Sequence, residues 1–483
     1  MRILMLGWEF PPYIAGGLGV ACHGLARALD ALGHEIVFVL PKSVPPASVG
    51  QRGRVVSPAI LRDRLARLTR MVPELEASGA ETPRVRVEPG PDGERVVVET
   101  TTTPATPAPG LDVREVAAGF NSPYPAFQAA LPPGMTDTTL TELRLRAERG
   151  DKAAAELVRS ILVREVEEIG QIGSSEHHYS GDLFGDAARY ARLVTAIARD
   201  EHFDVVHAHD WLAYPAGIAV AQATGRPLVV HVHATEFDRS GSAVNQQVYD
   251  IERAGMHAAS RVCAVSMLTK KICESRYGVA GDKIDVVWNG VEQGGNQPGS
   301  GVQIAAADKI VLFLGRITMQ KGPEYFIAAA KRVLEKIENV KFVVAGSGDM
   351  AMRMIDLAAG MGIGHKVLFT GFLKGKDVDR IFRMADCYVM PSVSEPFGIA
   401  ALEALNNGTP IIVSKQSGVA EALTHALKVD FWDIDEMANK IVAVLKYPPL
   451  GRTLVEHGTF EVRRLTWEGA AEKTVETYRR AIG

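Results

Sequence analysis

Two glutamates in the segment SEPFGIAALEAL have a spacing that suits the binding of an extended ligand. Glu395 precedes Gly398 and Glu403 follows it, so a helix that opens near Gly398 would separate the carboxylates by ~12 Å. That span is comparable to the distance between the sugar ring and the ribose of a nucleotide-sugar. One carboxylate is expected to hold a transferred sugar and the other the ribose hydroxyls. On an ordinary surface helix the same pair would be two solvated charges, so the neighbouring motifs decide the interpretation.

Two cations follow a strongly apolar run in the segment FLGRITMQKG. Arg316 and Lys321 lie in the glycine-flanked loop between a strand expected to end at Leu314 and the next helix. Cations at the C-terminal edge of a parallel sheet, beside a helix N-terminus, form an anion site without a metal. The pair Asp433 and Asp435 is interpreted as a helix N-cap. The sequence therefore predicts neither a metal site nor a cofactor, and a nucleotide-sugar as substrate.

Glycines and histidines mark the ends of earlier strands. Gly16 and Gly17 follow the first apolar run, where exposed backbone amides can approach a phosphate. His231 and His233 alternate along LVVHVH and so share one face of a strand. Asp210 ends the neighbouring run in HAHDW. A strand-end histidine is often only structural, but the convergence of these residues on one sheet edge favours a binding site.

The elements that must position these residues alternate between short apolar runs and helical periods. Apolar runs at residues 3–6 and 36–40 flank a stretch with helical periodicity, and the same alternation begins again at 309–315. Continuously apolar runs are typical of parallel strands covered on both faces. The sequence thus predicts an α/β fold built from two doubly wound sheets.

A segment rich in Gly, Pro, Ser and Gln at residues 292–308 resembles a linker between the two units. Residues from about 43 to 180 show neither alternating series of apolar runs and helical periods, and they are expected to form an insertion in the first unit. The insertion contains a hairpin pattern at 84–99, a threonine and proline tract, and a basic amphipathic helix around 60–71. The basic helix could contact a membrane surface, but a solvated helix with one face on the core is the simpler interpretation.

Composition excludes several classes of function. The chain has 483 residues, of which 47% are hydrophobic, and its 53 Lys and Arg against 57 Asp and Glu provide no field for nucleic acid. No segment has the length of a membrane span or a signal peptide, so a cytoplasmic enzyme is expected. The cysteines lack metal-site spacing and are interpreted as buried thiols in a reducing compartment: Cys22, Cys263, Cys273 and Cys387.

Together, GGLG, HDW, the strand-end histidine, GRxxxxKG and SEPFGxxxLEAL resemble the retaining GT-B glycosyltransferases. The resemblance is nearest to the glycogen and starch synthases, within a broad family that includes sucrose synthases and mannosyltransferases. It covers nearly the whole chain except residues 43–180. It implies two Rossmann-like domains that face a central cleft.

The resemblance also implies an assignment for each part of the chain. Residues 1–291 would form the acceptor-side domain with its insertion at about 43–180, and residues 309–464 the domain that binds the nucleotide-sugar. Residues 465–483 look like the terminal helix that crosses back to the first domain.

On the donor side, the resemblance implies that Arg316 and Lys321 bind the pyrophosphate. Glu395, with the amides of Phe397 and Gly398, would hold the donor sugar, and Glu403 the ribose.

On the other side of the cleft, the resemblance implies that His233 sits at the reacting sugar. Asp210 and His231 are assigned to the sugar or acceptor, and the loop of Gly16 and Gly17 would close on the donor.

The expected reaction is transfer of glucose, with retention and without a metal, from ADP- or UDP-glucose to the non-reducing end of an α-1,4-glucan. The nucleotide stays open because Ile14 occupies the position of a lysine in starch-synthase-like enzymes. The tract HVHATEFDRSG is closer to the archaeal-type glycogen synthases. Two alternatives remain: a related GT-B transferase that uses another sugar or acceptor, of the mannosyl or sucrose type, and a GT-B-shaped binding protein without turnover. The expected partners are a nucleotide-sugar and an α-glucan or other glycan, with neither nucleic acid nor membrane.

Overall fold

The computed structural model describes most of the two regular units. The described residues are 1–11, 16–42, 47–58, 60, 66, 84–90, 93–99, 143–147, 149, 151–169, 182–199, 201–292 and 308–483. Ile14, the threonine and proline tract, most of the basic helix at 60–71 and nearly all of the linker at 292–308 lie outside them.

The first half of the chain forms an eight-stranded sheet in the order β10-β9-β8-β7-β1-β2-β4-β3. Neighbouring strands pair in parallel, except that β3 and β4 are antiparallel. The chain builds outward from β1 on one side and then crosses to β7 on the other, so the strand order reverses between β1 and β7. The strands are β1 (Arg2–Leu6), β2 (Glu35–Val39), β3 (Ala47–Val49), β4 (Gly53–Val56), β7 (Val205–His209), β8 (Leu228–Val232), β9 (Arg261–Ala264) and β10 (Ile284–Val286).

Helices cover both faces of this sheet because its central strands are buried on both sides, as their continuous apolar runs predict. Local signals set several helix ends. The side chains of Asp182 and Ser266 cap α5 and α9, and Gly278 ends α9 in the left-handed conformation. The helices are α1 (Gly17–Ala31), α4 (Lys152–Ile169), α5 (Leu183–Ala198), α6 (Tyr214–Thr224), α7 (Glu236–Ser240), α8 (Gln246–Ala258), α9 (Met267–Tyr277) and the short η2 (Gly281–Lys283).

The second half forms a six-stranded parallel sheet in the order β13-β12-β11-β14-β15-β16. Here the order reverses between β11 and β14. In such sheets ligands bind outside the carboxyl ends of the strands at the reversal. The strands are β11 (Lys309–Leu314), β12 (Val340–Ala345), β13 (Val367–Gly371), β14 (Cys387–Met390), β15 (Ile411–Ser414) and β16 (Leu427–Val429).

The helices of the second half again pack on both faces of their sheet. Asp433 caps α15 by accepting the Glu436 amide, which confirms the prediction that it is an N-cap. The elements are η3 (Met319–Lys321), α10 (Pro323–Leu334), α11 (Ala351–Gly360), η4 (Gly364–Lys366), α12 (Lys376–Met384), α13 (Ile399–Asn406), α14 (Val419–Ala422), α15 (Ile434–Lys446) and α16 (Pro448–Val462). Two doubly wound α/β sheets are thus confirmed.

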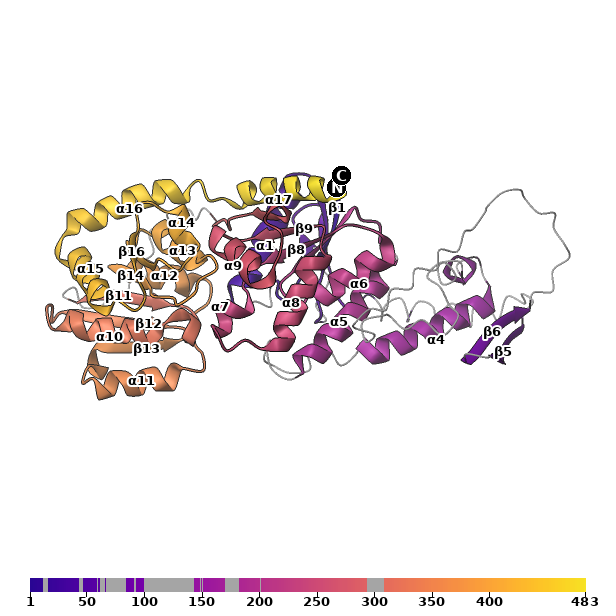
Figure 1. Ribbon diagram of the computed structural model, residues 1–483, viewed down its shortest axis with the longest axis horizontal. Coiled ribbons are helices and arrows are strands. Elements are labelled where there is room, and N and C mark those ends of the chain that lie inside the picture. The colour runs from indigo at the N-terminus through magenta and orange to yellow at the C-terminus, as the bar shows by residue number, and fades with distance from the viewer. Residues whose placement is uncertain are drawn as a thin grey trace.

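The last helix, α17 (Trp467–Ile482), leaves the second half and packs on the first. It contacts α1, β7, β8 and β9, and its buried Trp467 and Tyr478 belong to the same apolar cluster as Cys22 and Leu25 of α1. Figure 1 shows α17 lying along the first half, with the two chain termini close together. The C-terminal helix α17 is therefore part of the hydrophobic core of the first half.

The hairpin predicted at 84–99 is confirmed. Strands β5 (Arg84–Gly90) and β6 (Gly93–Glu99) pair antiparallel, and with α4 they lie at the end of the molecule away from the second sheet (Figure 1).

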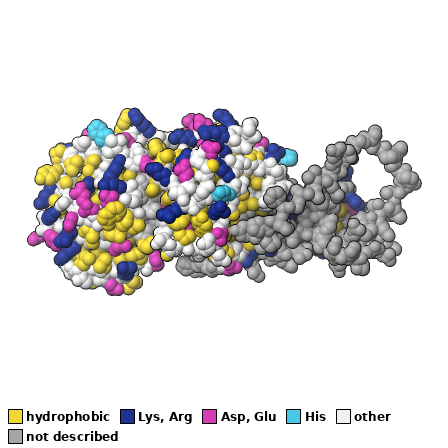
Figure 2. Space-filling model, viewed as in Figure 1, with side chains coloured by type: hydrophobic (Ala, Val, Ile, Leu, Met, Phe, Trp, Pro, Cys, Tyr) yellow, Lys and Arg dark blue, Asp and Glu magenta, His cyan; other side chains and the backbone are white. Residues whose placement is uncertain are grey.

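The described surface carries charged side chains of both signs. Acidic and basic side chains are interspersed over the coloured face in Figure 2, without a broad basic patch. Among the described residues, no helix combines the length and apolar character needed to cross a membrane. All four cysteines are buried and unpaired, as predicted.

Candidate functional site

In the second half, the loops after β11 and β14 bring two predicted residues together. The ammonium group of Lys321 donates to the Glu395 carboxylate at 2.5 Å, and the Ser392 hydroxyl donates to the same oxygen at 3.2 Å. Gly322 allows this approach: its φ is +63°, and a Cβ there would lie 2.3 Å from the Pro391 carbonyl oxygen. Glu395 is only 7% exposed, so this is a partly buried ion pair at the strand-order reversal.

The structure corrects one premise about the glutamate pair. Glu395 does not share a helix with Glu403, because α13 begins only after Gly398, whose φ of +110° breaks the path of the chain. Glu395 instead pairs with the loop after β15: its amide donates to Gln416 O, and the Gly418 amide donates to its carbonyl, each at 2.9 Å. A separation computed from helical rise therefore does not apply to this pair.

The N-terminus of α13 presents backbone donors. The amides of Phe397 and Gly398 donate no hydrogen bond to another described residue. The Phe397 side chain is 2% exposed and packs in the core of the second half. Glu403 lies one turn along α13 and is partly buried. Burial, helped by the nearby Asp379 charge, raises the pKa of Glu403 to about 7.

Arg316 differs from Lys321 in its environment. It follows Gly315 at the end of β11 and is exposed, and its guanidinium forms no ion pair with any residue in the described part of the chain. The two predicted cations thus share one loop, one paired and one solvated.

In the first half, four histidines form a layer on one side of β7 and β8. His207 and His209 project from β7, with ring centroids 4.3 Å apart. His231 lies in β8 and His233 directly follows it, with the same 4.3 Å spacing, which confirms that they share a face. Across the strands, the His209 and His233 rings lie 5.1 Å apart.

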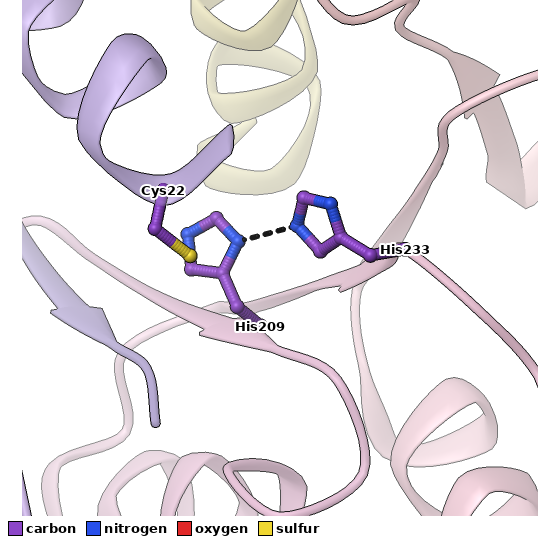
Figure 3. Close-up of side chains that lie close together, drawn as sticks. All are labelled: Cys22, His209 and His233. Atoms are coloured by element: carbon purple, nitrogen blue, oxygen red, sulfur yellow. Dashed lines mark hydrogen bonds between the residues drawn. The ribbon is translucent and has the colours of Figure 1, made fainter. Parts of the chain in front are cut away.

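A hydrogen bond of 2.9 Å joins His209 Nδ1 to His233 Nε2 (Figure 3). Burial holds the pKa of each of the four histidines below its ordinary value, and that of His233 at about 3. These rings are therefore neutral at physiological pH. His231 is 1% exposed, whereas His233 is only partly buried, so His233 is the outer member of its pair.

Asp210 anchors the backbone that carries His233. Its Oδ1 accepts the His233 amide at 2.7 Å, and its own amide donates to the His231 carbonyl at 3.0 Å. Asp210 has φ +59°, the single positive value among the described non-glycine residues, a conformation that Asp tolerates better than most residues. Burial raises the pKa of Asp210 to about 7, and the Arg239 charge opposes that rise.

The glycine loop differs from the expectation at one position. The Gly16 amide donates to the Glu9 carboxylate at 3.1 Å, so in this structure it is not free for a phosphate. Gly17 opens α1, is exposed, and has open space around its Cβ position. Glu9 is 1% exposed, and its place just beyond β1 is the sequence signal that could have identified it.

Comparisons with known proteins identify relatives of this chain. The profile of the group 1 glycosyl transferases matches residues 301–459, that of Glycosyltransferase Family 4 matches 145–293, and that of the starch synthase catalytic domain matches 2–66. An uncharacterized glycosyltransferase of Methanocaldococcus jannaschii is 33% identical over 302 residues, which cover 58% of this chain and 76% of that protein. The chain is a family 4 glycosyltransferase. It is of the retaining, GT-B type.

More distant relatives align with nearly the whole length of this chain. A glycogen synthase of Mycobacterium tuberculosis is 24% identical over 491 residues, covering 99% of this chain and 94% of its own. The structure of Anabaena HepE in complex with UDP and glucose superposes with a TM-score of 0.60 at 15% identity, covering 99% of both chains. At this sequence identity, the similarity to HepE shows a shared fold alone.

The two halves of this glycosyltransferase are joined by contacts that sequence reasoning missed. Helix α7, which follows His233, lies against η3, which ends at Lys321. The Ser394 hydroxyl donates to Asp238 at 2.5 Å, and the Glu421 carboxylate accepts the first two amides of α9 at 2.9 and 2.6 Å. The segments after β8 and β9 are thereby held beside those after β11, β14 and β15. No local spacing signals such pairs.

Proposed function

We propose that this enzyme transfers glucose from ADP- or UDP-glucose to the non-reducing end of an α-1,4-glucan. The observation that carries the proposal is the Lys321–Glu395 pair at the strand-order reversal of the second sheet, because it joins a pyrophosphate-binding cation to a sugar-binding carboxylate. The full-length similarity to a glycogen synthase supports the choice of glucose and glucan. The UDP and glucose bound to Anabaena HepE place UDP-glucose among the donors to test.

In the proposed complex, Lys321 and Arg316 contact the donor pyrophosphate. Both charges gain most when negative charge develops on the leaving nucleoside diphosphate, so they lower the barrier without a metal. Glu395 and the Phe397 and Gly398 amides would hold the glucose, since amides at the start of α13 favour oxygen acceptors. Glu403 would accept the ribose hydroxyls.

The acceptor side would come from the first half, residues 1–291. Neutral His233 offers a hydrogen bond to the reacting sugar, and Asp210 holds its backbone while Oδ2 accepts a sugar hydroxyl. Buried His231 is proposed to act by supporting the His233 ring. Of the glycine loop, Gly17 is the residue positioned to close on the donor.

Retention requires the acceptor hydroxyl to enter on the face from which the nucleotide leaves. The bond between the sugar C1 and the phosphate oxygen breaks, the new C1–O bond forms, and the acceptor proton moves to the departing phosphate oxygen. No protein nucleophile takes part.

A nucleoside-diphosphate release assay tests the proposal directly. ADP-, UDP- and GDP-sugars would be compared with and without glycogen, and the product digested by α-glucan-specific hydrolases. Glycogen-dependent release from ADP- or UDP-glucose is expected. Release only from GDP-mannose, or only without glucan, would identify another transferase, and no release under any condition would favour a binding protein.

Chelation should not lower turnover, because Lys321, Arg316 and the α13 amides provide the positive charge at the leaving group. The measurement is initial rate after dialysis against EDTA, with and without added Mg²⁺ or Mn²⁺. An enzyme silenced by EDTA and restored by either ion would contradict the metal-free mechanism.

Donor affinity should rise with pH. Glu403 has a raised pKa of about 7, so it is protonated below that pH and becomes a full acceptor for the ribose hydroxyls above it. Between pH 6 and pH 8 its ionised fraction rises about tenfold, and the dissociation constant of the nucleoside diphosphate should fall by a similar factor. Isothermal titration calorimetry at each pH measures this dissociation constant. The nucleotide phosphate itself titrates near pH ~6, so Glu403→Gln is the control: it should bind more weakly and lose most of the pH dependence. An equal slope in both proteins would remove Glu403 from the ribose.

A further inference from the structure

A second chemical site lies within the histidine layer of the first half. Cys22 of α1, His209 of β7 and His233 each offer a ligand atom, and these three atoms lie within 4.8 Å of one another. Figure 3 shows the Cys22 sulfur beside the His209 ring, with the His233 ring on the far side of the hydrogen bond. Three elements far apart in the chain therefore converge on one soft-donor cluster.

A second observation concerns the other ring nitrogens of the histidine layer. His209 is fully buried, and its Nε2 has no hydrogen-bond partner among the described residues. Beside it, His207 Nε2 and both ring nitrogens of His231 are also buried without a hydrogen-bond partner among the described residues. A buried polar atom without a partner is costly, so several in one layer require an explanation. Because burial keeps these rings neutral, their lone pairs are available to a cation.

We propose that Cys22, His209 and His233 bind one thiophilic cation, of which Zn²⁺ is the representative. One thiolate and two imidazoles form a donor set that selects Zn²⁺ over Mg²⁺ or Ca²⁺, and three protein ligands leave a fourth position for water. The three ligand atoms now lie within 4.8 Å of one another, so zinc binding requires shifts of up to about 1 Å. In a tetrahedral zinc site the ligand atoms lie about 3.3–3.6 Å apart.

Binding would move one proton of the present structure and release another. The cation takes the place of the hydrogen between His209 Nδ1 and His233 Nε2, and that hydrogen moves to His209 Nε2, so both imidazoles stay neutral. The 2.9 Å separation of the two nitrogens must widen by a few tenths of an ångström. Burial raises the pKa of the Cys22 thiol, so its proton leaves to solvent only when the cation arrives to balance the thiolate charge. The ion thus compensates the negative charge of the Cys22 thiolate, which burial otherwise disfavours.

The consequence is inhibitory, and this part rests on the proposed role of His233. His233 Nε2 already bonds to His209, so the proposed hydrogen bond to the sugar comes from His233 Nδ1. Zinc on Nε2 widens the pair and turns the His233 ring, which moves Nδ1 away from the reacting sugar. Occupation of the site would therefore switch the transferase off, and removal of the ion would restore it.

Cobalt titration of the full-length, chelator-stripped protein tests the site without reference to activity. Co²⁺ bound to a thiolate gives a near-ultraviolet charge-transfer band, which Zn²⁺ displaces. We expect one equivalent in the wild type, no such band in Cys22→Ser, and at least tenfold weaker binding in His209→Gln. His425→Ala is the matched control, since His425 belongs to a different histidine pair, stacked on His457 and bonded to Glu461, and should bind like the wild type.

Absence of the thiolate band in the wild type would overturn the proposal, and so would wild-type cobalt affinity in both site variants. Thermal unfolding checks each variant, and His209→Gln decides if Cys22→Ser is not folded. In the activity arm, Cys22→Ser should retain basal turnover and lose at least tenfold in sensitivity to Zn²⁺. If no donor is turned over, the cobalt band still decides the metal site, so the two proposals fail separately.

Discussion

Replacing Lys321 by alanine is expected to lower kcat by about 10²-fold or more, because loss of one preorganised charge at a leaving group costs ~3 kcal/mol. Lys321 is the cation that the structure holds against Glu395, at 2.5 Å. The substitution removes the charge and leaves a carboxylate that is 7% exposed without its counter-ion. Turnover is measured by nucleoside-diphosphate release at saturating donor.

Arg316→Ala should lower kcat to a similar degree, yet the two variants should differ in stability. Arg316 is exposed and has no ion pair within the described structure, so its removal should leave the thermal midpoint unchanged. Lys321→Ala should lower the midpoint as well, because one partner of a partly buried pair is lost. Lys331→Ala, on the exposed side of α10, is the control for loss of a lysine. Near-normal turnover in Lys321→Ala or Arg316→Ala would refute the phosphate assignment for that residue.

The second large effect concerns stability: Gly24→Val should lower the free energy of unfolding by about 3 kcal/mol, the upper part of the range for overpacking. A Cβ at Gly24 of α1 would lie 2.2 Å from the Trp467 ring of α17. Because Trp467 is 6% exposed and belongs to the core of the first half, neither helix can move aside without opening that core. Chemical denaturation followed by circular dichroism measures the change.

Gly451→Val is the matched control, since it places the same side chain in α16, where the nearest atom to the new Cβ is 3.9 Å away. The double variant Gly24→Val with Trp467→Ala should be less destabilised than the sum of the two single changes, because they share one contact. Additive effects, or a stable Gly24→Val protein, would show that α17 does not pack on α1 in this way.

Much of the architecture was predictable because its signals are local. Apolar runs of four to six residues alternating with helical periods indicate buried parallel strands, and these became two doubly wound sheets. The hairpin at 84–99 and the capping role of Asp433 follow from neighbours in sequence, and both were confirmed. The meeting of Lys321 and Glu395 was predictable in the same way, since residues that follow the ends of parallel strands meet at one edge.

What sequence determined by itself is therefore the set of strands and helices, the edge of each sheet where polar residues gather, and membership of the glycosyltransferases. Tertiary structure alone decided which of those residues touch. The Glu9 contact with Gly16 and the meeting of Cys22, His209 and His233 depend on the packing of separate elements. The contact of Glu421 with α9 depends on how the two sheets face one another. Hydrogen bonds and metal-ligand distances are set within a few tenths of an ångström, whereas periodicity fixes only the face or edge on which a side chain lies.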